Sequence, residues 1–240
     1  MLALQGDVVE HVRVLRALGA EPLAVKTRED LEGVRALIVP GGESTTVIRL
    51  LDRFGLTEPL RSRVADGMPF WGTCMGMIVA ARDVAGLEQK TLGVLDVTVR
   101  RNAFGRQIAS GEVPLAIPVL GTDPFPGVFI RAPWVERAGP GVEVLATLAD
   151  HPVFVRQGNV MGTSFHPELT NDVRLHAYFL RMLPYGAGEA SGAGDAIGAG
   201  DAIGPIVAAG LVSGAGMPGD IGSPDSSDSG VIPRSPGSRS

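Results

Sequence analysis

The segment Ala36–Val39 is apolar throughout, and a Pro40-Gly41-Gly42 turn follows it directly. A strand without a polar face has to be covered on both sides, as the strands of parallel sheets are. Segments with a helical spacing of apolar residues lie before and after it, at residues 8–18 and 44–54. This alternation predicts an α/β protein with a three-layer, open, mainly parallel sheet and flanking helices.

Further elements are predicted from short apolar runs bounded by turn residues. We expect strands at 2–4, 22–25 and 69–71 and helices at 57–65, 74–82 and 171–183. After residue 92 the pattern changes, and we expect appended antiparallel or mixed strands at 94–99, 107–113, 128–130, 142–145 and 160–164. The residues predicted to face the core on the first and last helices are Val8, Val9, Val12, Leu15, Leu18, Val173, His176, Phe179, Leu180 and Leu183.

The composition divides the chain near residue 185. Residues 186–240 contain no aromatic residue and no lysine but 14 glycines, and they repeat the sequence GAGDAI. Such a segment cannot bury enough apolar area to offset the entropy that it would lose on ordering. We therefore expect a folded domain at residues 1–185 and a low-complexity, disordered tail at residues 186–240, whose removal should leave the thermal stability unchanged.

Cysteine content and charge restrict the class of protein. The 240-residue chain has one cysteine, four histidines and a formal net charge of −5. One cysteine excludes an intramolecular disulfide and a cysteine-based zinc site, and the scattered histidines predict no metal site. The charge does not favour a nucleic-acid surface. Without a signal peptide or an apolar run of ~18 residues, we expect a soluble cytoplasmic protein with no membrane span.

The sharpest local motif is Gly72-Thr73-Cys74-Met75-Gly76, between a predicted strand and a predicted helix. The Gly-x-Cys-x-Gly spacing is that of a nucleophile elbow, in which a sharp turn pushes the central side chain outward. A helix amino terminus behind Cys74 favours the thiolate. An isolated cysteine is more often a small core residue, but this spacing favours a nucleophile.

A thiol nucleophile needs a base, and the base needs a group that orients it. His166-Pro167-Glu168 offers both, just after the last predicted strand. An exposed turn histidine is the alternative interpretation of this short string. His11 and His176 are predicted on helices as structural or exposed residues, and His151 has no comparable partner in the sequence.

The Pro40–Thr45 segment directly after the apolar strand is the third motif. Its glycines let bare backbone approach a ligand, and the N–H groups of Gly42 and Met75 could form an oxyanion hole. A phosphate-binding loop is a competing interpretation, which the lack of a lysine after the glycines disfavours. A plain tight turn with Ser44 as the helix cap is another.

Together, Gly72–Gly76 and His166–Glu168 resemble the class I (triad) glutamine amidotransferases. Longer strings resemble one branch of that class, the PdxT/SNO glutaminase subunits of pyridoxal 5′-phosphate synthase. These strings are Leu4–Asp7 with Glu10-His11, Pro40–Thr45, Arg101–Gln107, Phe129–Pro133 and Ser164–Thr170. The resemblance covers residues 1 to about 184.

The resemblance implies that Cys74, His166 and Glu168 hydrolyse L-glutamine to L-glutamate and ammonia through a γ-glutamyl thioester, without a cofactor. It also implies that residues 1–185 are a glutaminase domain, and that the ammonia passes to a (β/α)8-barrel synthase subunit of the PdxS/SNZ type. The residues that it implies for glutamine binding are Gly42, Glu43, Ser44, Arg101, Ile130 and Arg131. Charge supports Arg101 and Arg131 in part, because the substrate carboxylate needs a cation, although a surface ion pair explains either arginine as well.

Two features depart from the family pattern. Met75 stands where members of the family usually have alanine, so a larger side chain has to fit beside the nucleophile. Met1 begins inside the first predicted strand. We therefore expect this strand to be short, and an apolar upstream extension to add roughly 1–3 kcal/mol of stability.

Three other functions stay open. A glutaminase subunit of another amidotransferase, such as that of histidine biosynthesis, is disfavoured by the Arg101–Gln107 string. A non-catalytic docking subunit is disfavoured by the intact triad, and a cysteine hydrolase or chaperone of the elbow type usually lacks the His-Pro-Glu string. Glutamine hydrolysis, measured with and without a synthase subunit, would distinguish these functions.

Overall fold

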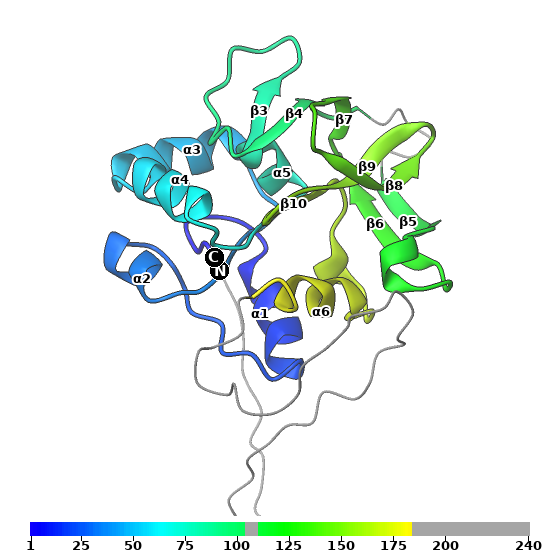
Figure 1. Ribbon diagram of the computed structural model, residues 1–240, viewed down its shortest axis with the longest axis horizontal. Helices are drawn as coiled ribbons and strands as arrows, with labels where there is room; N and C mark the ends of the chain where they lie inside the picture. Colours follow the sequence, from blue (N-terminus) through cyan, green and yellow to red (C-terminus); the bar gives the residue numbers. More distant parts are fainter. Residues whose placement is uncertain (104–109, 184–240) are drawn as a thin grey trace, which may run out of the picture. The chain divides into compact units, whose positions relative to one another are not determined.

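The computed structural model describes residues 1–103 and 110–183. Its largest sheet has five strands in the order β1-β2-β10-β9-β8 (Figure 1). β1, β2 and β10 pair in parallel, and β9 and β8 continue the sheet in antiparallel pairs. The strand bounds are Leu37–Val39 (β1), Phe70–Thr73 (β2), Val160–Thr163 (β10), His151–Gln157 (β9) and Glu143–Leu148 (β8).

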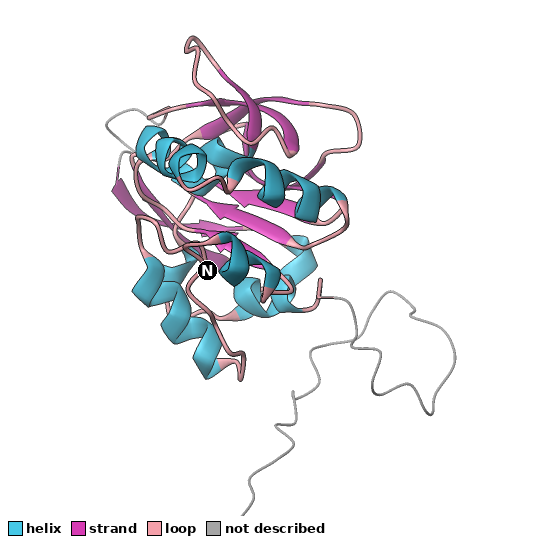
Figure 2. Ribbon diagram, turned by 90° about the vertical axis from the view of Figure 1, so that its left-hand side faces the viewer, coloured by secondary structure: helices cyan, strands magenta, loops and turns pink. Residues whose placement is uncertain are grey.

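Helices cover both faces of this sheet (Figure 2). Along β1, Leu37 and Val39 belong to the core beneath α3, α4 and α5, whereas Ile38 belongs to the core beneath α1 and α6. This alternation is the two-residue period of a strand that is buried on both faces. The three-layer α/β class predicted from the sequence is therefore confirmed. These helices span Val8–Ala17 (α1), Ser44–Arg53 (α3), Thr57–Ala65 (α4), Met75–Ala80 (α5) and Arg174–Leu180 (α6).

Two smaller sheets are built from the middle of the chain. The strands predicted at 94–99 and 128–130 belong to them, but those predicted at 142–145 and 160–164 correspond to β8 and β10 of the large sheet, and β10 pairs in parallel with β2 rather than as an appended strand. One has the order β3-β4-β7, with β3 parallel to β4, and the other pairs β5 with β6 in antiparallel. The bounds are Ala81–Val84 (β3), Leu95–Arg100 (β4), Trp134–Ala138 (β7), Ser110–Leu115 (β5) and Phe125–Ile130 (β6). Two short 3₁₀ turns are η1 (Pro118–Leu120) and η2 (Pro167–Leu169).

The strands predicted at 2–4 and 22–25 reduce to one parallel bridge between Leu2 and Val25. The segment still extends the large sheet beside β1, because the Leu2 N–H donates to the Ile38 carbonyl at 2.9 Å. Met1 is buried as well, and its ammonium group donates to the Leu23 carbonyl at 2.9 Å.

The predicted inward face of α1 is partly wrong. Val9 is 74% exposed, whereas His11, Val14 and Leu15 are buried. The helix can bury His11 because α6 offers the imidazole of His176 as a polar partner.

Several element boundaries also differ from the prediction. The helix predicted at 74–82 ends at Ala80, because Ala81–Val84 pairs with β4 instead. The last helix begins only at Arg174, and Val173 before it is exposed. The sequence analysis missed β7, β9 and α2 (Arg28–Glu32), although Thr27 begins α2 with a capping box.

Three predictions fall wholly or partly outside the described residues: the second half of the Arg101–Gln107 string, the start of the strand predicted at 107–113, and the tail at 186–240. Within residues 1–103 and 110–183, no helix has the length and apolar character needed to cross a membrane.

Candidate active site

Cys74 lies at the sharp turn between β2 and α5, at the carboxyl end of a parallel strand. Its backbone has φ of 48° and ψ of −108°, a conformation that residues other than glycine rarely adopt. The Cys74 N–H donates to the Thr163 carbonyl of the neighbouring strand β10 at 2.7 Å. This bond holds the turn in place, and the geometry is that expected of a nucleophile elbow.

The glycines on either side of Cys74 have a steric reason. A Cβ atom on Gly72 would overlap the carbonyl of Gly76, and one on Gly76 would overlap the carbonyl oxygen of Val39 in β1. Because one obstacle is backbone of α5 and the other is backbone of β1, neither can move aside without disturbing the fold. The spacing found in the sequence is thus required by close packing of the turn.

His166 follows β10, and β10 is the parallel neighbour of β2, so the two strands deliver His166 and Cys74 to the same edge of the sheet. His166 Nδ1 lies 2.8 Å from Glu168 Oε1, and the Glu168 side chain is fully buried in η2. Cys74 is the other group that acts on the charge of the His166 ring. Because Nδ1 faces Glu168, Nε2 is the ring nitrogen left for Cys74.

The surroundings of His166 favour its protonated form. Burial alone would lower the pKa of His166, but hydrogen bonds to Cys74 and Glu168 outweigh burial and raise this pKa to about 10. Burial raises the pKa of Glu168, and the hydrogen bond from His166 acts in the opposite direction. His166 is therefore an imidazolium at neutral pH, and it could give a proton to a group that leaves a carbon atom attacked by the Cys74 sulfur.

A chain of buried side chains continues behind Glu168. His11 Nε2 lies 3.2 Å from Glu168 Oε2 and 3.3 Å from Thr73 Oγ1, and His11 Nδ1 lies 2.9 Å from His176 Nε2. His11 and His176 are each 0% exposed, and both rings pack edge-on against Trp71. The sequence analysis missed this cluster, because it considered His11 and His176 only as separate helix residues.

The Pro40–Thr45 loop passes directly beside the triad. A Cβ atom on Gly41 would overlap His166 Cε1, and Gly42, with φ of +152°, packs against the Gln5 side chain. Gln5 Oε1 in turn accepts the N–H of Glu43 at 2.8 Å. The loop thus brings Gly42, one of the two predicted oxyanion donors, close to the residues that would do the chemistry.

Met75, the other predicted oxyanion donor, follows Cys74 directly. Its side chain is 3% exposed and belongs to the hydrophobic core beneath α3, α4 and α5. The Met75 side chain, although larger than that of alanine, therefore packs inside the core and not at the entrance of the site.

Three of the predicted glutamine-binding residues form one hydrogen-bonded network. The Arg101 guanidinium donates to Glu43 Oε1 at 3.3 Å and to Gln89 Oε1 at 3.0 Å, and Gln89 Nε2 donates to Ser44 Oγ at 2.9 Å. A hydrogen bond from the Thr45 hydroxyl lowers the pKa of Glu43 to about 2, so Glu43 is ionised at neutral pH. No sequence signal indicated Gln89, which connects Arg101 to Ser44.

The end of β6 reaches the nucleophile from the other side. Cys74 Sγ lies 3.9 Å from the carbonyl oxygen of Ile130. The next residue, Arg131, is exposed and has φ of 45°, so the chain turns sharply there. The structure thus brings Ile130 and Arg131 to the same side of the site as Cys74.

Asp7 adds a second carboxylate near the base. Asp7 Oδ2 lies 3.5 Å from His166 Nδ1, and the donor atoms of Asp7, His166 and Glu168 lie within 4.8 Å of one another. Such a cluster has the composition of a metal site. A metal ion there would have to displace the 2.8 Å contact between His166 and Glu168, and the geometry therefore fits proton transfer better.

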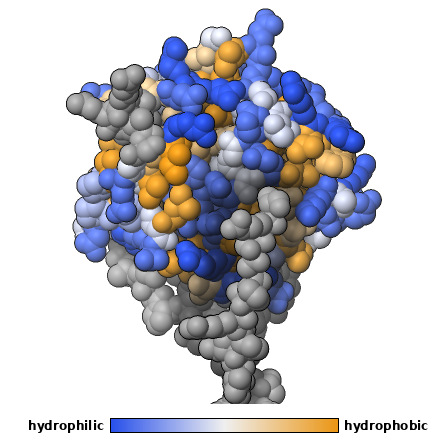
Figure 3. Space-filling model, turned by 180° about the vertical axis from the view of Figure 1, so that it is seen from behind, coloured by the Kyte–Doolittle hydropathy of each residue, from blue (hydrophilic) through white to orange (hydrophobic). Residues whose placement is uncertain are grey.

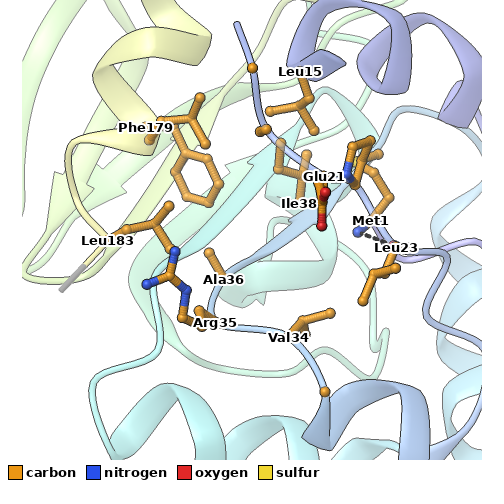
Figure 4. Close-up of a pocket in the computed structure, with 15 residues that line it drawn as sticks. Met1, Leu15, Glu21, Leu23, Val34, Arg35, Ala36, Ile38, Phe179 and Leu183 are labelled. Atoms are coloured by element: carbon orange, nitrogen blue, oxygen red, sulfur yellow. Dashed lines mark hydrogen bonds between the residues drawn. The ribbon is translucent and has the colours of Figure 1, made fainter. Parts of the chain in front are cut away.

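A separate hollow of about 440 Å³ lies away from this edge of the sheet (Figure 4). Arg35 and Ala36, which line it, precede β1, whereas the Pro40–Thr45 loop follows β1. The hollow is therefore at the amino end of the strand, opposite the triad. The described residues of its lining combine apolar side chains with Glu21 and Arg35 and include no cysteine, serine or threonine, and the hollow does not belong to the site of Cys74.

Comparison with known families matches residues 1–184 to the SNO glutamine amidotransferase family. The chain belongs to this family. The resemblance predicted from the Gly-x-Cys-x-Gly and His-Pro-Glu motifs is thereby confirmed.

Relatives of this SNO-family chain include two curated proteins named "Pyridoxal 5′-phosphate synthase subunit PdxT". The one from Moorella thermoacetica is 51% identical over 183 residues, which are 76% of this chain and 97% of the relative. The one from Salinispora tropica is 55% identical over 186 residues, which are 75% of this chain and 92% of the relative.

Solved structures agree with this assignment. A crystal structure of a glutamine amidotransferase is 54% identical, with a TM-score of 0.72, and the match covers 76% of this chain and 96% of that one. PurLQS from Thermotoga maritima is 14% identical with a TM-score of 0.55, and its match covers 77% of this chain and 96% of that one. This second likeness concerns the fold alone.

Proposed function

We propose that this chain is the glutaminase subunit of a pyridoxal 5′-phosphate synthase and hydrolyses L-glutamine to L-glutamate and ammonia. The observation that carries the proposal is the placement of Cys74, at a strained elbow after β2, beside the hydrogen-bonded pair of His166 and Glu168 that follows the neighbouring parallel strand β10. The names of relatives that are 51% and 55% identical support the choice of synthase.

In the first half of the reaction, the Cys74 thiolate attacks the side-chain amide carbon of glutamine. Negative charge develops on the amide oxygen, and the N–H groups of Gly42 and Met75 would stabilise it. The His166 imidazolium gives its proton to the amide nitrogen, and the C–N bond breaks. Ammonia leaves, and a γ-glutamyl thioester on Cys74 remains.

In the second half, neutral His166 takes a proton from water, and the resulting hydroxide attacks the thioester carbon. The C–S bond breaks, glutamate leaves, and the thiolate and imidazolium are restored. Glu168 forms no bond to substrate in either half. It keeps Nδ1 of His166 protonated, so that Nε2 always faces Cys74.

The substrate's charged ends fit the groups around the triad. Ionised Glu43 suits the α-ammonium group, and the cations Arg101 and Arg131 suit the α-carboxylate. Gln89 and Ser44 keep Arg101 and Glu43 in one network, so these residues would position glutamine as a unit. Ile130 contributes its carbonyl oxygen beside Cys74.

We further propose that the ammonia passes to a (β/α)8-barrel synthase subunit of the PdxS/SNZ type, in the cytoplasm. Exposed apolar side chains near the site support a docked partner: Ile130 is 38% exposed, Leu169 43% and Val9 74%. They lie on β6, η2 and α1, and α1 packs against η2. Apolar patches also appear among polar side chains on the face drawn in Figure 3.

Glutamate release from glutamine tests the proposal, measured for the full chain with and without a PdxS-type subunit. The Cys74→Ala variant should lose activity while keeping the wild-type circular dichroism spectrum. Near-normal hydrolysis by this variant would refute the mechanism. No hydrolysis by the wild-type chain under either condition would instead favour a docking subunit without catalysis.

A further inference from the structure

The second oxygen of the Glu168 carboxylate, Oε2, lacks a clear hydrogen-bond donor in the described part of the chain. Oε1 serves His166, but Oε2 is fully buried and has no well-aligned hydrogen bond among the described residues. The imidazole of His11 is placed to donate to this oxygen, because its Nε2 lies 3.2 Å from Glu168 Oε2. A buried carboxylate oxygen without a donor is costly, so a small rotation of either group that aligns the N–H would be favourable.

The tautomers of the buried histidines are limited by this carboxylate. Burial lowers the pKa of His11 well below its ordinary value and the pKa of His176 to about 4, so both rings are neutral. Each neutral ring has one donor and one acceptor nitrogen. If His11 Nε2 carries the hydrogen and faces Glu168, then His11 Nδ1 accepts from His176 Nε2 at 2.9 Å. With the opposite tautomers, the lone pair of His11 Nε2 would face the negatively charged carboxylate, and this arrangement is unfavourable.

We propose that His11 is a positioning residue of the reaction, whose Nε2–H holds the second oxygen of Glu168 and thereby fixes the carboxylate that orients His166. His176 anchors the other side of the His11 ring, and Thr73 Oγ1 lies 3.3 Å from Nε2. The predicted effect of His11 on kcat rests on the proposed glutaminase function. The predicted effect of His11 on the Cys74–His166 pair does not depend on the substrate.

The test has to separate His11 from other charged groups around the triad. His166 is faced by Cys74 at the start of α5, by Glu168 in η2 and by Asp7 before α1, while Glu168 is also faced by His11. Asp7 is 44% exposed at its side chain and lies 3.5 Å from His166 Nδ1. An Asp7→Asn variant therefore serves as a comparison, in which the charge near His166 changes but the contact of His11 with Glu168 does not.

Alkylation of the single cysteine is a readout that needs no glutamine. The rate of iodoacetamide reaction with Cys74, followed against pH, reports the formation of thiolate beside the imidazolium. The variants are His11→Leu, which fills the volume without a donor, and His11→Gln, whose amide can donate to Glu168 and accept from His176. His151→Leu is the matched control, because His151 lies in β9 and stacks on Trp134 outside this cluster.

In His11→Leu we expect the alkylation midpoint to rise by about one pH unit, because the imidazolium loses part of its support. We expect kcat with glutamine to fall about 10- to 100-fold, the size of losing one hydrogen bond to a charged group, while KM changes by less than about threefold. His11→Gln should recover most of both effects, and His151→Leu should match the wild type. We also combine Asp7→Asn with each His11 variant. The double variant with His11→Gln should still have a lower alkylation midpoint and a higher kcat than the double variant with His11→Leu.

An unchanged alkylation midpoint and kcat in folded His11→Leu would overturn the proposal, and so would a His11→Gln variant that is no better than His11→Leu. If His11→Leu does not fold, His176→Phe replaces it. This variant removes the anchor of His11 Nδ1 but keeps a ring beside Trp71, and it should shift the midpoint in the same direction; no shift would overturn the proposal. A midpoint shift in a chain that does not hydrolyse glutamine would refute the proposed function alone.

Discussion

Replacing His176 with phenylalanine is expected to weaken the dependence of folding stability on pH. His176 is 0% exposed, and burial lowers its pKa to about 4 from an ordinary value of 6.5. Between these two values the unfolded chain holds a proton on His176 and the folded chain does not. The contribution of His176 is therefore fully present above pH 6.5 and is lost as the pH falls toward 4.

The size of this loss can be worked out from the two pKa values. With 6.5 in the unfolded chain and about 4 in the folded chain, His176 removes about 1.8 kcal/mol of unfolding free energy between pH 7 and pH 5. His166 changes stability in the opposite direction near pH 6.5–7, because its pKa is raised, but both the wild type and the variant keep His166, so this change cancels when the two are compared. His11 adds a loss of the same sign, since its pKa is also lowered by burial.

Urea unfolding at pH 7, 6 and 5 measures the effect. The variant loses the His176–His11 hydrogen bond at every pH, so the informative quantity is the change in unfolding free energy between pH 7 and pH 5. This change should be smaller in His176→Phe than in the wild type by about 1.8 kcal/mol. The control His151→Phe, in the partly exposed β9 position, should keep the wild-type change. Equal pH dependence in His176→Phe and the wild type would refute the reasoning.

Three further predictions concern the site. Glu168→Ala should lower kcat by up to about 10⁴-fold but less than loss of Cys74 does, because Glu168 orients His166 without touching substrate; equal losses in steady-state kinetics would contradict this. Gly76→Ala should lower the unfolding free energy by about 1–3 kcal/mol, because its Cβ would overlap the Val39 carbonyl oxygen, and an unchanged denaturant midpoint would count against the elbow packing. Arg101→Ala should raise the KM for glutamine more than it lowers kcat, because it removes a cation that is tied to Glu43; a change in kcat alone would show that Arg101 does not bind the ground-state substrate.

Local pattern was enough to predict the strand and turn that carry Cys74, and a strand before His166, but not that this strand is the parallel neighbour of β2. The apolar run at β1 and the glycine spacing around Cys74 report constraints that act within a few residues, namely burial on both faces and backbone overlap in a tight turn. The start of α3 at Ser44 agrees with the prediction for the same reason, although Glu43 rather than Ser44 supplies the capping side chain.

Features that depend on distant partners could not be predicted in this way. The end of α5 at Ala80 is decided by the pairing of the next four residues with β4, which the sequence Ala81-Arg82-Asp83-Val84 does not reveal. The burial of the His11 side chain depends on the imidazole of His176, which lies 165 residues away in the chain. Gln89 likewise has no motif of its own and joins the site only because Arg101 and Ser44 lie within hydrogen-bond distance.

The presence of a single cysteine in the whole chain also determines how the site would respond to oxidants. A thiolate beside an imidazolium reacts readily with peroxide to give a sulfenic acid. Many redox-regulated proteins stop there by forming a disulfide with a neighbouring resolving thiol, but this chain has none to offer Cys74. Reduction of the sulfenic acid would depend on a free thiol small enough to enter the site, since Cys74 is only 8% exposed. Without one, continued oxidation would carry Cys74 to the sulfinic acid, and the loss of activity would be permanent.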